Sequence, residues 1–219
     1  MLDKVHADVL SSFLDYRVAY REPVFDFLRL YGQISQSVFR AFREWNVTIE
    51  NISSKQNPNS LSDISTTFTL PGGRIAFSVG LGMSNLFVSN PNWSEAGMIA
   101  KVAQAGVTAV VGATGAIVDQ QKASIAMHLR PAAGSIKDAV SNLLRLSADE
   151  LQTEDVRAYG VSIYRKDSTW IVDASATYQD ALFMRIDRIW DSQMPLDEGA
   201  AQLQADETRV LDLLRLEVD

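Results

Sequence analysis

The 219-residue chain contains no cysteine, and its two histidines are His6 and His128. The absence of cysteine excludes disulfide bonds, thiolate nucleophiles and cysteine metal sites, although it leaves the redox compartment open. With so few histidines and no Gly-x-Ser-x-Gly nucleophile elbow, the chain has little from which to assemble a catalytic triad. We therefore expect no metal and no cofactor, and we favour a non-enzymatic protein over an enzyme.

The chain also lacks an excess of positive charge. Its formal net charge is −7, and residues of both signs are spread along its length. Nucleic-acid-binding surfaces need a basic stripe that displaces counterions from phosphates, so nucleic acid is not expected as a partner. The N-terminal stretch holds Asp3 and Asp8 and no sustained apolar run. This composition argues against a secretory signal and predicts a cytoplasmic protein.

One well-patterned β-hairpin is present at residues 61–81. If Gly72 and Gly73 form its turn, the bulkier apolar residues of the two arms fall opposite one another. The predicted pairs on this face are Leu70 with Ile75, Phe68 with Phe77, Thr66 with Val79 and Ile64 with Leu81. The other face pairs Thr69 with Ala76, Thr67 with Ser78 and Ser65 with Gly80. The first face is therefore suited to a hydrophobic core.

The residues before this hairpin show a strand pattern and then a helix pattern. Residues 13–21 alternate between apolar and polar side chains, which predicts a half-buried strand. Aromatic and aliphatic residues then recur at helical spacing from Phe27 to Trp45. A second strand is expected to begin near Val47, and the polar stretch 53–60 has the composition of a loop. Residues 86–89 add a short strand after the hairpin.

A helix rich in glycine and alanine is predicted at residues 93–118, with Asn92 as its N-cap. Ala105, Ala109 and Ala113 lie four residues apart and offer a flat face for close packing. The charge-free part is only marginally long enough to span a membrane, so we favour a buried packing helix and expect no membrane partner. Its glycines lack the Gly-Lys-Ser/Thr ending of a phosphate-binding loop.

The second half repeats the order of the first. It predicts a strand near 125–129, a helix capped by Ser135, strands at 156–164, 169–177 and 181–190, and a two-sided helix from 197 to 219. The fold class is therefore α+β, with antiparallel sheet packed against a few long helices. We expect a single compact domain over 1–219, in which halves 1–90 and 120–219 are joined by helix 93–118. A tandem β-α-β-β-β duplication is an open alternative.

This tandem order resembles that of the vicinal oxygen chelate metalloenzymes, which place His and Glu metal ligands on the first and last strands of each module. The resemblance covers the element order alone. The first strand here carries Tyr16, Arg17 and Tyr20 where that family has a histidine, and no glutamate occurs in 75–81 or 182–190. No activity and no ligand set are therefore carried over to this chain.

Three residues are candidates for a binding site: His128, Arg130 and Trp93. His128 lies on the polar side of a predicted strand beside Arg130, where a general base is conceivable, but a surface or hydrogen-bonded strand histidine is favoured. A charged group comprises Asp173, Arg185, Asp187 and Arg188. A loop at 178–180 would set Ala176 against Leu182, Ala174 against Met184, Val172 against Ile186 and Asp173 against Arg185.

Two functions fit these patterns. The favoured one is a non-enzymatic protein-interaction module, expected to be homo-oligomeric, that presents an antiparallel sheet or its edge to a protein partner. The alternative is a small-molecule-binding protein or enzyme, with a pocket between the helices and a curved sheet and with His128, Arg130 or Trp93 at its rim. The sequence does not specify which protein or which ligand is bound.

Overall fold

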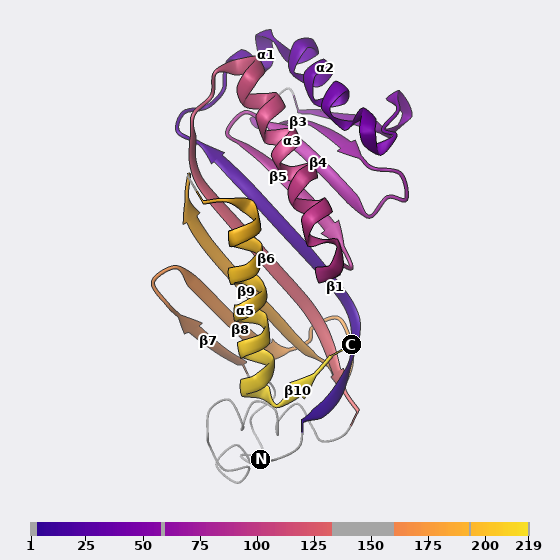
Figure 1. The fold of residues 1–219 in the computed structure, drawn as a ribbon, viewed down its shortest axis with the longest axis vertical. Helices are drawn as coiled ribbons and strands as arrows, with labels where there is room; N and C mark the ends of the chain where they lie inside the picture. Colours follow the sequence, from indigo (N-terminus) through magenta and orange to yellow (C-terminus); the bar gives the residue numbers. More distant parts are fainter. Residues whose placement is uncertain (1–3, 58–59, 133–159, 193, 219) are drawn as a thin grey trace. The chain divides into compact units, whose positions relative to one another are not determined.

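The computed structural model describes residues 4–57, 60–132, 160–192 and 194–218. The described residues confirm the α+β class, with an antiparallel sheet of ten strands and four α-helices (Figure 1). The strands are β1 (Val5–Tyr20), β2 (Ile52–Asn57), β3 (Ser60–Thr69), β4 (Ile75–Gly80), β5 (Met83–Ser89), β6 (Val118–Pro131), β7 (Gly160–Tyr164), β8 (Ser168–Ala174), β9 (Leu182–Asp191) and β10 (Leu216–Glu217). The helices are α1 (Asp26–Arg29), α2 (Tyr31–Ala41), α3 (Ala96–Thr114) and α5 (Leu196–Leu214). Hydrogen bonds order the strands β2-β3-β4-β5-β1-β6-β9-β8-β7, and β10 adds a parallel pair with β1.

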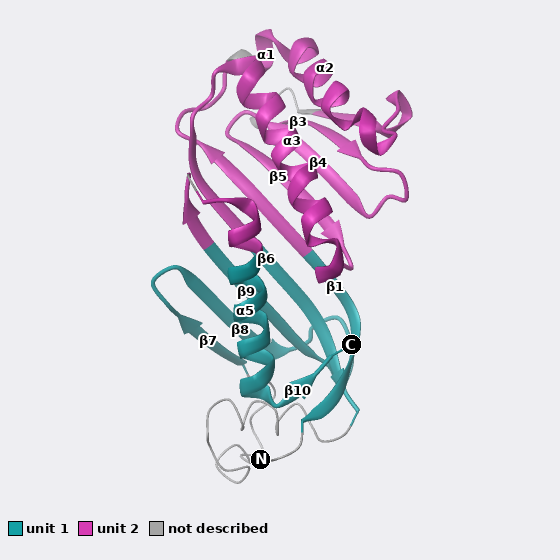
Figure 2. Ribbon diagram, viewed as in Figure 1, with its two compact units in different colours: residues 1–13, 124–188, 201–219 teal, residues 14–123, 189–200 magenta. Residues whose placement is uncertain are grey.

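Two compact units divide the chain, as Figure 2 shows by colour. Unit 1 comprises residues 1–13, 124–188 and 201–219, and unit 2 comprises residues 14–123 and 189–200. Strands β1, β6 and β9 and helix α5 therefore contribute residues to both units. The expectation of one domain with halves 1–90 and 120–219 stays a prediction.

The core of unit 2 is built on the predicted hairpin. Strands β3 and β4 pair with Phe68 opposite Phe77 and Thr66 opposite Val79, so the predicted register is confirmed. Both phenylalanines are buried, and the ring of Phe42 lies edge-on to each of them. The connecting loop contains Gly72 and Gly73, both at positive φ, a conformation that a side chain would strain.

The segments before the hairpin differ from the prediction in three ways, one of which is that the second strand, expected near Val47, begins at Ile52 after a 3₁₀ turn at Ile49–Asn51. The strand expected at 13–21 is longer, because β1 begins at Val5 and its first residues pair with β10. The helix expected from Phe27 to Trp45 is divided into α1, α2 and a 3₁₀ turn at Phe42–Trp45, which ends at Asn46 in the left-handed conformation. Its apolar stripe nevertheless supplies buried residues, including Phe27 and Phe42.

The prediction of a loop at the polar stretch 53–60 is wrong over most of that stretch. Residues Ile52–Asn57 form β2, which pairs with β3 and carries a bulge between Lys55 and Asn57. The physical reason is that the backbone of β3 offers a free hydrogen-bonding side, and an exposed edge strand needs no apolar side chains. The polar composition of these residues predicted a loop where the chain forms an edge strand.

Helix α3 packs against α2 and β4 within unit 2, and its solvent-facing positions are Gly97, Lys101, Gln104, Thr108 and Gly112. Its N-terminus follows a short 3₁₀ helix (Trp93–Glu95) at which the Asn92 side chain accepts a hydrogen bond from Ser94 N, as the capping pattern predicts. Within the described residues, the stretch Trp93–Thr114 is long and apolar enough to cross a membrane, with mean hydropathy 1.4 and 28% of that window buried. Core helices of soluble proteins meet the same test, so the packing role stays a prediction.

In unit 1 the predicted pairing of the last two long strands is wrong by two residues. Ala174 lies opposite Leu182, Val172 opposite Met184 and Ile171 opposite Arg185, so Asp173 faces Phe183 and not Arg185. The loop is longer than predicted because Ser175 N donates to Ala181 O and closes a wider turn. A shift of two residues leaves each side chain on its expected face of the sheet.

Helix α5 covers one face of the unit 1 sheet, and Leu203, Val210 and Leu214 of its predicted stripe are buried. It ends before Arg215, which adopts positive φ, and not at residue 219 as expected. Leu216, which lies off the stripe, is buried in β10. The helix expected after Ser135 lies outside the described residues, so the tandem duplication stays a prediction.

Candidate functional site

His128 lies on β6 in unit 1, among aromatic side chains. Its Nδ1 is 2.8 Å from Ser175 Oγ, and its ring centroid lies 5.1 Å from that of Tyr178 and 5.2 Å from that of Phe183. Partial burial among these groups disfavours the imidazolium form and lowers the pKa of His128. The histidine is therefore expected to be neutral at pH 7.

The contact between Ser175 and His128 has the composition of a catalytic dyad, and the serine hydroxyl also contacts two backbone amides. Ser175 Oγ accepts hydrogen bonds from Thr177 N at 3.2 Å and from Tyr178 N at 2.9 Å. A hydroxyl oxygen has two acceptor lone pairs, so its O–H donates to His128 Nδ1. Three hydrogen bonds thus hold the serine hydroxyl, and they tie the loop after β8 to His128 on β6.

The other two predicted binding residues do not complete a site around His128. Arg130 is exposed on the same strand, and its guanidinium donates to Gln179 O at 3.4 Å. Trp93 belongs to the other unit, in the 3₁₀ helix before α3. His128 and Arg130 thus both contact the loop between β8 and β9, and the three residues form no common cluster within one unit.

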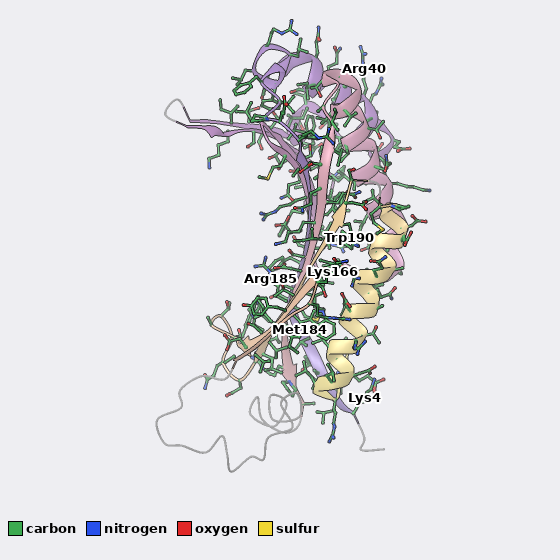
Figure 3. The ribbon with its side chains drawn as sticks, turned by 90° about the vertical axis from the view of Figure 1, so that its left-hand side faces the viewer. Lys4, Arg40, Lys166, Met184, Arg185 and Trp190 are labelled. Carbon is green, nitrogen blue, oxygen red and sulfur yellow. The ribbon has the colours of Figure 1, made fainter. Side chains whose placement is uncertain are left out.

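The predicted charged group is divided between the two faces of the unit 1 sheet. Asp187 accepts hydrogen bonds from Ser124 and from Arg185 Nε, the latter at 2.9 Å. Arg185 points away from α5 (Figure 3). Arg188 instead reaches the α5 side, where it forms an ion pair with Asp206 and donates to Gln202. The four residues therefore do not form one cluster, because Arg185 pairs with Asp187 on one face and Arg188 pairs with Asp206 on the other.

Asp206 is the most buried member of an ionic cluster beneath α5, and its side chain is 8% exposed. Arg188 and Arg165 both contact its carboxylate, the second at 3.5 Å. The Arg165 guanidinium also lies 4.9 Å from the centroid of the Trp170 ring, in a cation–π arrangement. The cluster therefore anchors α5 to the sheet, and sequence patterns gave no sign of it.

Two buried tyrosines of β1 form a polar layer in unit 2. Tyr16 donates to Gln121 Oε1 at 2.6 Å, and the Tyr20 hydroxyl lies 2.6 Å from Ser84 Oγ. Burial raises the pKa of both phenols, that of Tyr20 to about 12. Both stay protonated at neutral pH and act as hydrogen-bonding groups of the core.

A cleft of 410 Å³ lies at the carboxyl end of α3 in unit 2. Arg21 and Glu22 line it together with Phe25 and Ile117, whose exposed fractions are 62% and 56%. It is bounded by the C-cap residue Gly115, and no basic residue lies in the last turn of α3. The lining of the cleft therefore includes two apolar side chains, Phe25 and Ile117, one positive side chain, Arg21, and one negative side chain, Glu22.

The two end strands of the sheet differ in how their outer edges are protected. Strand β2 carries Lys55 and a bulge, two features that discourage the addition of another strand. Strand β7 has the sequence GVSIY, with no charge, no proline and regular pairing to β8. Within the described part of the chain nothing pairs with its outer edge. The sequence pattern does not indicate this feature, because the position of a strand at an edge depends on the strand order.

The backbone of β7 directs alternate groups outward. Because Arg165 N donates to Ser168 O, Ile163 and Val161 bond to β8, and the amides of Gly160, Ser162 and Tyr164 point away from it. Tyr164 is 79% exposed. We call the outward side of residues 160–164 the β7 edge.

Among the described residues, no group of three or more His, Asp or Glu side chains could hold a metal ion. No protein-family model and no curated protein matches the chain. Among solved structures it is similar to the Physcomitrella patens BBE-like 1 variant, at 11% identity and a TM-score of 0.18. That match covers 93% of this chain and 43% of the other, so this chain spans less than half of that protein. A similarity this low carries no argument about fold or function.

Proposed function

We propose that the chain is a non-enzymatic protein-interaction module that binds a strand of a protein partner at the β7 edge. The observation that carries the proposal is the contrast between the two end strands, of which β2 is protected and β7 is not. Strand addition uses main-chain hydrogen bonds for affinity and alternate side chains for specificity. The β7 edge offers both, through its outward amides and the exposed ring of Tyr164.

The hydrogen bonding around His128 supports a role without catalysis. Ser175, the hydroxyl in contact with this histidine, is saturated by two backbone amides and by the imidazole. Of the ionic contacts described above, Arg185 and Asp187 pair within β9, and Arg188 and Arg165 contact Asp206 of α5. These features are what a binding scaffold requires, because a rigid sheet presents a fixed edge to its partner.

Photo-crosslinking tests the proposal in cells that express the chain. p-Benzoylphenylalanine in place of Tyr164 is expected to crosslink to a protein, whereas the same group in place of Ile49, which is 78% exposed, serves as the matched control. The proposal further requires that Ser162→Pro, which removes an outward amide from the strand edge, suppress the crosslink. Equal labelling from positions 164 and 49 would contradict it.

The cleft at the carboxyl end of α3 supports a second candidate, binding of a small amphipathic molecule between Phe25 and Ile117. A ligand that binds the folded state raises the melting temperature by mass action. A thermal-shift screen of metabolites therefore tests this candidate, with Phe25→Ala as the variant that should lose the shift. Hits that raise the melting temperature of both proteins equally would place the ligand elsewhere.

A further inference from the structure

We infer that the partner strand is β7 of a second copy of the chain, so that two chains join through an antiparallel β7–β7 pair centred on Ser162. This inference rests on the proposed function, because it names the partner of the same edge. Three features of β7 support it: the register that the outward amides impose, the side chains that this register brings together, and the absence of charge on the strand.

The outward backbone groups fix the register of such a pair. Gly160, Ser162 and Tyr164 are the residues whose amides point away from β8. An antiparallel pairing that uses all three places Ser162 opposite the partner's Ser162, and Tyr164 opposite the partner's Gly160. The two chains are then related by a two-fold axis through Ser162, and each contact is formed twice.

This register places the largest side chain of the strand over the position that has none. Tyr164, 79% exposed, would cover Gly160 of the partner subunit. Aromatic side chains that cover a glycine on a neighbouring strand stabilise sheets in this way. On the opposite face, Ile163 and Val161 are half-buried and would meet the partner's Val161 and Ile163. The strand is therefore complementary to itself on both faces.

Asp173 on β8 would add a polar contact on the face of the sheet that carries Tyr164. It lies opposite Gly160 on β8, and its carboxylate leans over the glycine, so that a Cβ at position 160 would be 2.8 Å from Asp173 Oδ1. Oδ1 accepts a hydrogen bond from Ala174 N at 2.7 Å, and within the described residues Oδ2 accepts none. The partner's Tyr164 ring, lying across Gly160, directs its hydroxyl toward this free oxygen. A phenol donating to a carboxylate forms a charge-assisted hydrogen bond.

Because β7 carries no charge, a second copy of β7 is favoured as its partner over an unrelated strand that carries charge. Like charges placed opposite one another destabilise a strand pair, and GVSIY places none there. Five residues from each chain form a small interface, so association is expected to depend on chain concentration. Sedimentation equilibrium should show a monomer–dimer system and no larger species, because the pairing closes on itself.

A cysteine crosslink tests the register directly, since the chain contains no other thiol. In Ser162→Cys the two thiols would be directly opposite, with Cα atoms roughly 5.5 Å apart, within the range of a disulfide. In the matched control Lys166→Cys, at an exposed position beyond the paired residues, the two Cα atoms would be farther apart than a disulfide can span. We expect oxidation to yield covalent dimer at least roughly tenfold faster for Ser162→Cys, because only that pair meets disulfide geometry.

Tyr164→Phe tests the hydroxyl contact without disturbing the fold, because the side chain is exposed. Losing two symmetric hydrogen bonds should raise the dimer dissociation constant by roughly tenfold or more. Equal crosslinking rates for the two cysteine variants, or a wild-type chain that stays monomeric, would overturn the second-copy inference. A photo-crosslink from position 164 to a different protein would also overturn it while supporting the proposed function. No specific crosslink from position 164 would overturn both.

Discussion

Gly106 of α3 lies directly against the ring of Phe77 on β4. A Cβ atom at position 106 would be 2.6 Å from Phe77 Cζ and 2.7 and 2.8 Å from the two neighbouring ring atoms. The predicted flat face of Ala105, Ala109 and Ala113 is half-buried, whereas Gly106 is buried. The glycine therefore allows the helix to approach the core face of the hairpin.

Gly106→Ala should lower the free energy of unfolding, because the added methyl group has to displace a ring that is itself buried. Overpacking of this kind costs about 1 to 3 kcal/mol, more than the gain in helix propensity. Gly112→Ala is the matched control on the same helix, where an added Cβ meets nothing within 4 Å. It should stabilise by up to about 1 kcal/mol. Urea unfolding of the two variants measures both effects, and equal stabilisation by both would refute the close contact.

Phe77→Ala should be among the most damaging changes in unit 2. The ring is 1% exposed and contacts Phe42 with centroids 5.4 Å apart, so truncation leaves a cavity and loses the burial of the ring. The expected loss in the free energy of unfolding is about 3 to 5 kcal/mol. Phe87→Ala, at a phenylalanine of the neighbouring strand that is 40% exposed, should cost about 1 kcal/mol or less. A loss below about 0.5 kcal/mol for Phe77→Ala would place its ring outside the core.

The two hairpins explain how much of the fold the sequence could predict. Around Gly72 and Gly73 the apolar alternation and a short loop define one register, and that register was predicted correctly. Around residues 175–181 the alternation fixed the faces but not the loop length. There Ser175 caps the loop by accepting from two amides, which moves the pairing by two residues. Periodicity determines which face a residue occupies, and loop hydrogen bonds determine its partner.

The candidate site was less predictable than the fold. His128 was recognised as a histidine on a polar face, but its contact with Ser175 spans 47 residues and depends on the strand order. The exposure of the β7 edge depends on that order in the same way, because the same five residues inside the sheet would offer no free amides. Local patterns carry no information on which strand ends a sheet.

Asp206→Ala should destabilise unit 1 by removing the carboxylate that Arg188 and Arg165 share. A charge left unpaired near the core is costly, and since Arg188 is 20% and Arg165 43% exposed, the expected loss is about 2 to 4 kcal/mol. Asp212→Ala is the control on the same helix, where the ion pair with Lys4 is about half exposed on both sides. That change should cost clearly less, because an exposed ion pair contributes little to stability. Similar losses from the two variants in urea unfolding would show that the buried cluster does not anchor α5.

His128 should make the free energy of unfolding depend on pH in the acidic range. Burial lowers its pKa in the folded chain below the ordinary value of 6.5. Between those two pKa values the unfolded chain binds the proton and the folded chain does not, so the free energy of unfolding falls as pH falls through this window. Above it both states are neutral, and below it both are protonated, so the contribution of His128 is constant on either side.

His128→Gln removes this titration and keeps a side chain that can accept from Ser175. The free energy of unfolding of the wild type minus that of the variant should therefore be constant above the ordinary histidine pKa. It should decrease as pH falls below that value. His6 is present in both proteins, so its titration cancels from the difference. Urea unfolding across this range measures the difference, and ¹⁵N chemical shifts of the imidazole should report a neutral ring protonated at Nε2. A wild type that gains stability over the variant on acidification would mean that the folded chain favours the imidazolium, contrary to the hydrogen bond from Ser175.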